Sequence, residues 1–263
     1  MNTSTHAREN ALITGASRGI GLELAKQFAR HGFDLVLVAR DVDRLAAVAA
    51  ELQRDFGVTV RTIAADLSTA DAPRAIVEQL DKQACNINVL VNNAGIASYG
   101  NFADTDLTRE LRMMQINMLS LVHLSKLLLP QMLARRSGRI VNVSSLGGYQ
   151  PGGPKWSVYM ASKSFVLSFS KGLGVELRGS GVSVTALCPG ATDTDFKTEN
   201  HLERTALYRL FAMTPARVAR LAYRGIIRRR TVVVPGLFNK ILAIAGEFPP
   251  RRIALEVNGL LMR

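Results

Sequence analysis

The sequence predicts an α/β fold in which helices cover both faces of a doubly wound, mostly parallel sheet of seven strands. Short apolar runs alternate with longer helical patterns along the whole chain, and no repeat or low-complexity linker interrupts them. A glycine-rich turn follows the first apolar run directly. The chain has 263 residues, 48% of them hydrophobic, so residues 1–263 are expected to form one domain with a large core.

The seven expected strands lie near residues 10–14, 34–39, 58–65, 87–92, 139–145, 181–188 and 231–234. Helices are expected in the gaps, including a long one from about residue 106 to residue 134. Continuous apolar runs of this length are typical of parallel strands that are covered on both faces. Crossovers between parallel strands are right-handed, so a ligand is expected at the carboxyl edge of the sheet.

After the first strand comes a turn of eight residues, Thr14-Gly15-Ala16-Ser17-Arg18-Gly19-Ile20-Gly21, and then a helical pattern. A pyrophosphate binds at the first turn of a helix, where backbone N–H groups lack partners and the helix dipole is positive. Side chains at Gly15, Gly19 and Gly21 would block that approach or the packing of helix on strand. The order of strand, turn and helix predicts a Rossmann-type dinucleotide pocket, with an ordinary flexible loop as the alternative.

A second pattern joins Tyr159 and Lys163, four residues apart at the start of an apolar-periodic run that reaches Leu177. On a helix such a pair lies on one face. The preceding expected strand ends in Ser144 and Ser145, and ligands bind where buried parallel strands end. A phenol, an ammonium and a hydroxyl are therefore expected to meet at one edge of the sheet. Taken alone, a tyrosine and a lysine four residues apart are usually part of a solvated helix face.

Together these motifs resemble the short-chain dehydrogenase/reductase family in its single-domain form. The resemblance covers roughly residues 9 to 235. Further motifs occur in the family's order, namely Asp66 after the third strand, Asn92-Asn93-Ala94-Gly95 after the fourth, Asn117 within a helix and Pro189-Gly190 after the sixth. The resemblance implies an oxidoreductase that interconverts a carbonyl and a secondary or primary alcohol by hydride transfer.

Tyr159 is the expected general acid and base. Hydride transfer to a carbonyl carbon leaves negative charge on the oxygen, which then needs a proton. A free phenol has a pKa of about 10, and an ammonium nearby favours the phenolate, so Lys163 is expected to make Tyr159 usable in both directions.

The resemblance gives roles to two further residues. Ser145 is expected to hold the substrate oxygen, and Asn117 to hold a proton-relay water against Lys163. From Ser145 to Tyr159 is 14 positions, one more than the spacing expected, so Ser144 stays an alternative for the role of Ser145.

The resemblance also implies the contacts of a dinucleotide. Asp66 is expected near the adenine amino group with Leu67 beside the ring, and Lys163 on the nicotinamide ribose. For Asn93 a structural role is as well supported as a contact with the cofactor. The full expected set is Gly15, Ser17, Arg18, Gly19, Ile20, Gly21, Arg40, Asp66, Leu67, Asn93, Ala94, Gly95, Tyr159, Lys163, Pro189, Gly190, Thr192 and Thr194.

The end of the second strand predicts NADP(H) as the cofactor. An acidic side chain at this place suits the ribose 2′-hydroxyl of NAD, whereas the 2′-phosphate of NADP needs positive charge. The first polar residue after the strand is Arg40, and Arg18 lies in the glycine turn. Two guanidinium groups are expected to bind the phosphate, and Asp41 is the one residue that argues against it. Both arginines are also consistent with plain surface positions.

Residues 192–213 are expected to form a lid over the substrate, because segments beyond the sheet edge can close over a ligand. The remaining walls are expected from residues after Ser145 and from residues 97–102. The lid contains the apolar residues Phe196, Leu202, Leu207, Leu210, Phe211 and Met213. They suggest an acyl chain, a sterol or another hydrophobic alcohol or ketone as substrate, and are equally consistent with a helix core.

The net charge of +12 is concentrated at the end of the chain. Twelve of the 33 basic residues lie between Arg204 and Arg263, against Glu247 and Glu256 alone, which gives this segment a net charge of +10. Residues 236–263 form a basic and apolar C-terminal extension. Basic amphipathic helices bind anionic membrane surfaces, so a peripheral membrane contact is one interpretation. The other is a solvated arginine face with apolar residues packed on the domain or on a sister subunit.

Other residue types narrow the function. The four histidines are scattered and Cys85 and Cys188 lack metal-type spacing, so no metal is expected. No nucleic-acid recognition motif accompanies the charge. No signal peptide and no apolar stretch long enough to span a bilayer are recognised, which suggests a cytoplasmic, or membrane-peripheral, protein. Family members are commonly homodimers or homotetramers. The alternative function is a non-catalytic NADP-binding protein that docks to a membrane or an acidic partner.

Overall fold

The computed structural model describes residues 8–196 and 211–247. Its sheet has seven strands in the order β3-β2-β1-β4-β5-β6-β7, and all six pairings are parallel. The strands are β1 (Asn10–Thr14), β2 (Asp34–Ala39), β3 (Val60–Ala64), β4 (Val89–Asn92), β5 (Gly138–Val143), β6 (Val182–Leu187) and β7 (Val232–Val233). The predicted fold class is confirmed, and each expected strand is present.

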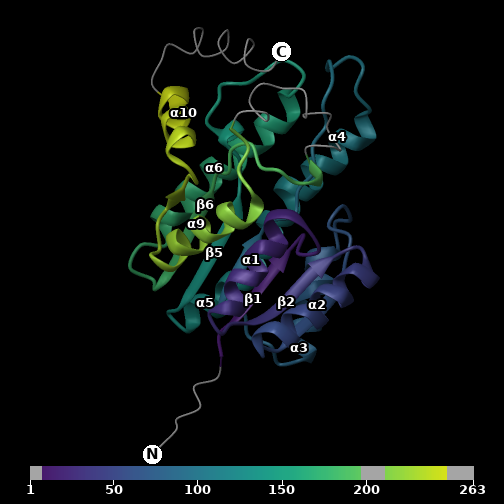
Figure 1. Cartoon of the computed structure of the whole chain (residues 1–263), viewed down its shortest axis with the longest axis vertical. Helices are drawn as coiled ribbons and strands as arrows, with labels where there is room; N and C mark the ends of the chain where they lie inside the picture. The colour runs from purple at the N-terminus through teal and green to yellow at the C-terminus, as the bar shows by residue number, and fades with distance from the viewer. Residues whose placement is uncertain (1–7, 197–210, 248–263) are drawn as a thin grey trace, which may run out of the picture.

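Helices cover both faces of this sheet (Figure 1). The described helices are α1 (Gly19–Arg30), α2 (Val42–Phe56), α3 (Ala72–Lys82), α4 (Leu107–Met114), α5 (Ser120–Ala134), α6 (Ser157–Glu176), α9 (Pro215–Ile227) and α10 (Leu237–Glu247), with short turns η1 (Gln115–Leu119) and η2 (Leu146–Gly148). Along β1, Ile13 belongs to the core under α1, α2 and α9, whereas Leu12 belongs to the core under α3 and α5. This alternation follows from the period of two in a strand and explains why the apolar runs are continuous.

The sheet places the site at the junction of β1 and β4. The chain moves outward from β1 to β2 and β3, then returns to β4 on the other side of β1. At such a switch in strand order the loops that follow the two neighbouring strands diverge and leave a crevice at their carboxyl ends. The glycine turn follows β1, and the segment from Asn93 to Gly95 follows β4, so both border this crevice.

The expected long helix is present as α4, η1 and α5, which continue one another from Leu107 to Ala134. Its middle turn η1 is a π-helix, a rare form that often occurs at functional sites. By length and composition alone this helix is long and apolar enough to cross a membrane, a test that core helices also pass, so it is no clear membrane span. Leu124, Leu128 and Met132 are fully buried on the sheet, as in core helices generally.

Part of the expected lid lies within the described residues. Its two ends run side by side, because Asp193 N donates to Met213 O at 2.9 Å and Met213 N donates to Ala191 O at 2.9 Å. Leu202, Leu207 and Leu210 lie outside the described residues, as does the part of the C-terminal extension after Glu247.

Candidate active site

The glycine turn forms a close-packed cradle at the start of α1. Gly15 and Gly19 have φ of 63° and 58°, in the left-handed region that suits glycine. A Cβ on Gly21 would collide with the carbonyl oxygen of Gly15 and with Nδ2 of Asn93. Within the described residues no side chain caps the N-terminus of α1, so its first N–H groups remain available to an anion. The turn therefore fits a pyrophosphate.

Asn93 and Thr14 hold this cradle together. Asn93 Nδ2 donates to the carbonyl oxygen of Thr14 at 2.8 Å and to that of Gly15 at 3.2 Å. Thr14 Oγ1 accepts from the backbone N–H groups of Asn93 and Ala94, each at 3.0 Å. These bonds join the turn after β1 to the turn after β4. They favour the structural role that the sequence left open for Asn93.

A cavity of about 690 Å³ runs from this cradle past the end of β5 to α6. Except for Gly21 and Asn117, all the site residues expected from the sequence line it. The sequence did not single out Arg44, Trp156, Asp195 and Leu242, which line it too.

Ser145, Tyr159 and Lys163 meet at one end of the cavity. The hydroxyl of Ser145 lies close enough to the phenol of Tyr159 to lower its pKa, and it accepts from Gly147 N at 3.1 Å. Lys163 Nζ donates to the carbonyl oxygen of Val143 at 3.0 Å and lies 5.8 Å from the centroid of the Tyr159 ring. The hydroxyl of Ser144 is buried and donates to the carbonyl oxygen of Lys163 at 2.7 Å, inside the framework. Ser145 is thus the serine whose hydroxyl meets the phenol.

Burial controls the protonation of this group of residues. It raises the pKa of Tyr159 to about 12, and the nearby hydroxyl of Ser145 lowers that pKa only in part. Burial also lowers the pKa of Lys163 to about 8. The sequence argument expected the ammonium to lower the pKa of the phenol, but in the chain alone the pKa is raised, and desolvation of the phenolate is the largest cause. Tyr159 therefore carries its proton at neutral pH and is ready to act as an acid.

Asn117 lies in the π-turn η1 and joins two parts of the site. Its Oδ1 accepts from Ile96 N at 3.0 Å, and its Nδ2 donates to Ile96 O at 3.0 Å and to Ser162 Oγ at 3.1 Å. A Cβ on Gly95 would lie 3.2 Å from Asn117 Oδ1 and 3.3 Å from Lys163 Nζ. The side chain of Asn117 thus fixes the segment after β4 against α6, while the water-holding role stays a prediction.

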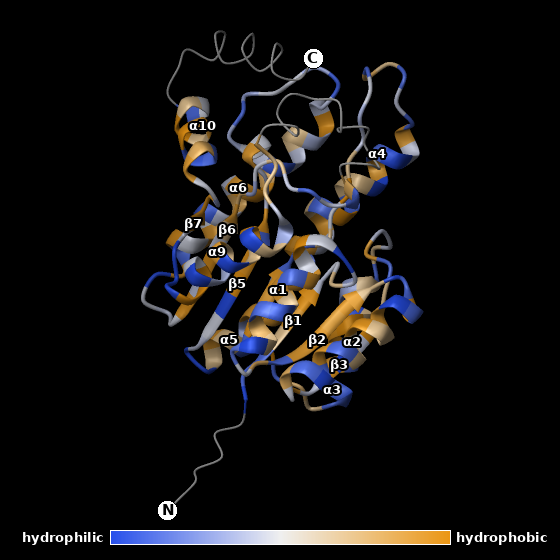
Figure 2. Cartoon of the chain, in the orientation of Figure 1, coloured by the Kyte–Doolittle hydropathy of each residue, from blue (hydrophilic) through white to orange (hydrophobic). Residues whose placement is uncertain are grey.

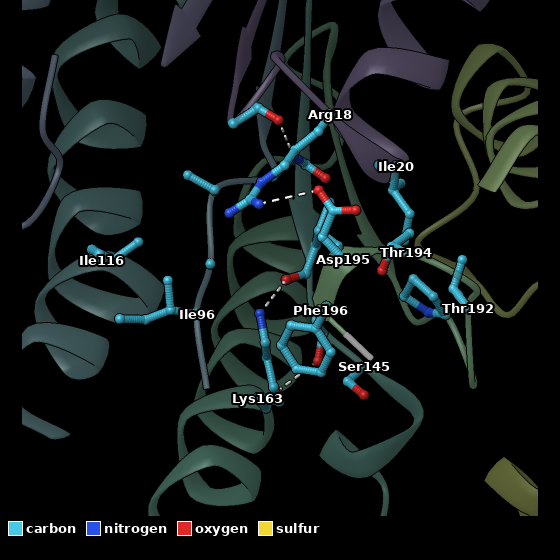
Figure 3. A pocket seen from close by; sticks show the side chains of 18 of the residues that line it. Arg18, Ile20, Ile96, Ile116, Ser145, Lys163, Thr192, Thr194, Asp195 and Phe196 are labelled. Atoms are coloured by element: carbon cyan, nitrogen blue, oxygen red, sulfur yellow. Dashed lines mark hydrogen bonds and ion pairs between the residues drawn. The ribbon is translucent and has the colours of Figure 1, made fainter. Parts of the chain in front are cut away.

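The other end of the cavity is bordered by charged residues. Arg18, Arg40 and Arg44 are exposed there. Asp41, which argued against NADP from sequence, accepts from Arg44 N at 2.9 Å and so caps α2. Arg18 Nη1 lies 3.1 Å from Asp195 Oδ2, and Figure 3 shows these side chains pointing toward one another.

Asp66, the expected adenine contact, is held from two sides. One carboxylate oxygen accepts from Ser68 N at 3.0 Å and the other from Arg112 Nη2 at 3.0 Å. Burial raises its pKa, but these hydrogen bonds and the charges of Arg112 and Arg40 outweigh burial and keep the pKa below its usual value. Asp66 is thus ionised at neutral pH and accepts hydrogen bonds, as contact with an amino group requires.

Comparisons with known proteins agree with this geometry. The family described as short chain dehydrogenase matches residues 9–205. A ketoacyl reductase, HetN of Nostoc sp., is 31% identical over 257 residues, which cover 95% of this chain and 88% of the relative. The 17-beta-hydroxysteroid dehydrogenase type 3 of Rattus norvegicus is 37% identical, over 70% of this chain and 60% of its own length.

A solved structure gives the same result in three dimensions. The short-chain dehydrogenase of Sphingobium yanoikuyae, in complex with NADPH, superposes with a TM-score of 0.81 at 37% identity and covers 90% of this chain and 92% of its own. The match to the family spans well over half of the residues. The chain therefore belongs to the short-chain dehydrogenase family of oxidoreductases.

Proposed function

We propose that this protein is an NADP(H)-dependent carbonyl reductase or alcohol dehydrogenase that acts on a hydrophobic substrate. The observation that carries the proposal is the meeting of Ser145, Tyr159 and Lys163 in the cavity that begins at the glycine turn. A pure nucleotide-binding protein has no need of this arrangement. The bound nicotinamide supplies the hydride or accepts it.

The roles of the side chains follow from their contacts. The protonated phenol of Tyr159 donates to the carbonyl oxygen as negative charge develops on it, and the Ser145 hydroxyl holds that oxygen as a fixed dipole. Lys163, anchored on Val143 O, holds positive charge near the phenol and favours the phenolate that remains. In the direction of alcohol oxidation the same phenolate removes the proton.

The proposed preference for NADP(H) rests on charge. Arg18 and Arg40 border one cavity with Arg44, and Asp41 is engaged as a helix cap. A 2′-phosphate gains charge-assisted hydrogen bonds from guanidinium groups that a ribose hydroxyl cannot match. A relative at 37% identity is in complex with NADPH, which supports this choice.

A hydrophobic substrate is supported by the walls beyond Tyr159. Tyr99, Trp156, Tyr159 and Phe196 pack as a chain of aromatic rings with Ala97 and Met160. Apolar walls bind apolar groups because both are removed from water on binding. Two relatives are named for hydrophobic substrates, one as a ketoacyl reductase and the other as a hydroxysteroid dehydrogenase.

The decisive measurement is NADPH oxidation with a panel of aldehydes and ketones of increasing chain length, and in parallel with NADH. We expect turnover with NADPH, with kcat/KM that rises along the series by about 0.8 kcal/mol, or roughly fourfold, per buried methylene. A rate with NADH equal to that with NADPH would overturn the cofactor preference. Turnover with none of the carbonyls would overturn the enzymatic function.

We propose in addition that the C-terminal part contacts a membrane with anionic lipid. On α10, Leu237, Ile241 and Ile244 are 76, 57 and 58% exposed, while Leu242 on the other side lines the cavity. Figure 2 shows apolar colour along α10, which lies with α4 at the end of the molecule away from α3. The basic excess after Arg204 complements an anionic surface. A substrate dissolved in the bilayer would then reach the cavity beside α10.

Vesicle sedimentation tests this contact. We expect binding to vesicles with anionic lipid that weakens with salt and with the variant Ile241→Ser/Ile244→Ser, but persists in Val175→Ser, which changes an equally exposed residue of α6. Absence of wild-type binding at every ionic strength would end this proposal. Residues 248–263, which lie outside the described part, are kept in all variants. The homodimer or homotetramer expected from the resemblance stays a prediction.

A further inference from the structure

Trp156 stands between the Tyr159 phenol ring and the loop after β4. Its side chain is 4% exposed, and its ring centroid lies 5.3 Å from that of Tyr159 at an interplanar angle of 62°. On the other side it lies 5.1 Å from the ring of Tyr99. An edge-to-face contact at this distance fixes the tilt of a ring as well as burying it. Trp156 directly precedes α6, three residues before Tyr159.

Backbone contacts fix the indole in this position. The carbonyl oxygen of Lys155 accepts from Gly100 N at 3.1 Å, and Lys155 Nζ lies 5.7 Å from the centroid of the Tyr99 ring. Lys155 has φ of 66°, a conformation that residues other than glycine seldom adopt. Such a conformation persists where the surrounding structure holds it in place. The loop after β4 and the start of α6 are therefore locked together at Trp156.

We propose that Trp156 is a positioning residue for Tyr159, whose indole holds the phenol toward Ser145 and keeps water away from it. The proposal rests on the proposed reduction by Tyr159. Ser145 lies at the end of β5 and Trp156 before α6, so the phenol is held between a hydroxyl partner and an apolar ring. Phe196 adds a second ring contact, at 5.7 Å between centroids.

The exclusion of water has a measurable consequence. Burial is the largest cause of the raised pKa of Tyr159, and the indole is part of the apolar surface that buries it. A smaller aliphatic side chain at position 156 would admit water and let that pKa fall toward its ordinary value. Four titratable groups surround this part of the site. Lys163 Nζ lies 5.8 Å from the centroid of the Tyr159 ring, Tyr99 packs on Trp156, Asp195 lines the same cavity, and Cys188 acts electrostatically on Lys163. All four are kept in the variants below.

The kinetic test compares Trp156→Leu with Trp156→Phe. In Trp156→Leu we expect kcat for ketone reduction to fall about tenfold or more while KM for NADPH changes less than about twofold, because the cofactor contacts are intact. Reduction needs the protonated phenol, so the alkaline loss of kcat should begin about one pH unit lower than in wild type. Trp156→Phe keeps an aromatic edge and should restore most of kcat and of the pH profile.

Phe33→Leu is the matched control. Phe33 is 8% exposed and packs edge-to-face on Phe28 in the core, at 5.1 Å, so its replacement removes a comparable aromatic contact far from the site. It should lower stability without moving the alkaline limb. A general loosening of the fold would instead move the limb in both variants, and that outcome would overturn the proposal.

A titration without turnover separates this inference from the proposed function. Tyrosinate absorbance is measured against pH for a protein that has Tyr159 and for the matching Tyr159→Phe variant, and the difference between the two curves is the titration of Tyr159. This difference is obtained once in the wild-type background and once in the Trp156→Leu background. We expect the difference to titrate at lower pH in the Trp156→Leu background. Equal midpoints, or equal kcat and pH profile, would overturn the role of Trp156. A wild type that reduces no carbonyl, with midpoints that still differ, would overturn only the proposed function.

Discussion

Tyr159→Phe should reduce carbonyl reduction by a factor of about 10²–10⁴, the usual contribution of a positioned general acid. The change removes the only proton that the phenol can give to the developing oxyanion, and leaves the ring contacts with Trp156 and Phe196 in place. The measurement is the initial rate of NADPH oxidation with the best ketone of the panel. A variant that keeps more than a few per cent of the wild-type rate would argue against Tyr159 as the acid.

Binding of NADPH should survive this change. Trp156 is the only tryptophan of the chain and lines the same cavity, so quenching of its fluorescence reports cofactor binding without turnover. We expect the Kd of NADPH to change less than about twofold, because one hydroxyl contributes little to a ligand of this size. Tyr223→Phe, which removes a hydroxyl from the core beside Phe28, is the control and should leave both rate and binding unchanged.

The double variant Arg18→Ala/Arg40→Ala should weaken NADPH by about 30- to 100-fold and NADH far less. Two charge-assisted hydrogen bonds to a phosphate are together worth about 2–3 kcal/mol after a discount for exposure and salt screening. The measurement is the Kd of each dinucleotide from Trp156 fluorescence at low and at high salt. The difference between the two dinucleotides should shrink as salt is added.

Two further variants make this result specific. Arg54→Ala removes an exposed arginine at the far end of α2, where it pairs with Asp55, and should change neither Kd. Asp195→Asn removes the partner of Arg18 but keeps the guanidinium, so it separates loss of the ion pair from loss of the phosphate contact. If the double variant weakened NADPH and NADH equally, the arginines would be acting on the shared pyrophosphate, and the preference for NADP(H) would lose its basis.

Local sequence patterns sufficed for the framework because their causes are local. Continuous apolar runs predicted the strands, since a strand with two buried faces has no polar positions to interrupt it. The glycine turn predicted the cradle, since a Cβ at Gly21 has no room beside Gly15 and Asn93. The spacing of Tyr159 and Lys163 placed them one helical turn apart, and α6 contains both.

Other assignments depended on residues far apart in the sequence. Ser145 was chosen over Ser144 because the hydroxyl of Ser144 donates to Lys163 O. Asp41 no longer argues against NADP(H), because its carboxylate accepts from Arg44 N at the start of α2. The side chain of Asn117 joins Ile96 to Ser162 across two elements, a role that its sequence motif did not indicate. A π-turn at that place has no simple sequence signature.

The sequence by itself determined the order of strands and helices, the dinucleotide cradle and the pairing of Tyr159, the proposed proton donor, with Lys163, because helix period, strand period and glycine geometry act within a few residues. The tertiary structure alone decided the protonation of that donor. Burial raises its pKa to about 12, and the Ser145 hydroxyl lowers that pKa only in part. The rings of Trp156 and Phe196, which contact the Tyr159 ring from outside its own motif, are part of the apolar surface that buries it. Desolvation depends on everything that surrounds a group in space, and no spacing along the chain records it.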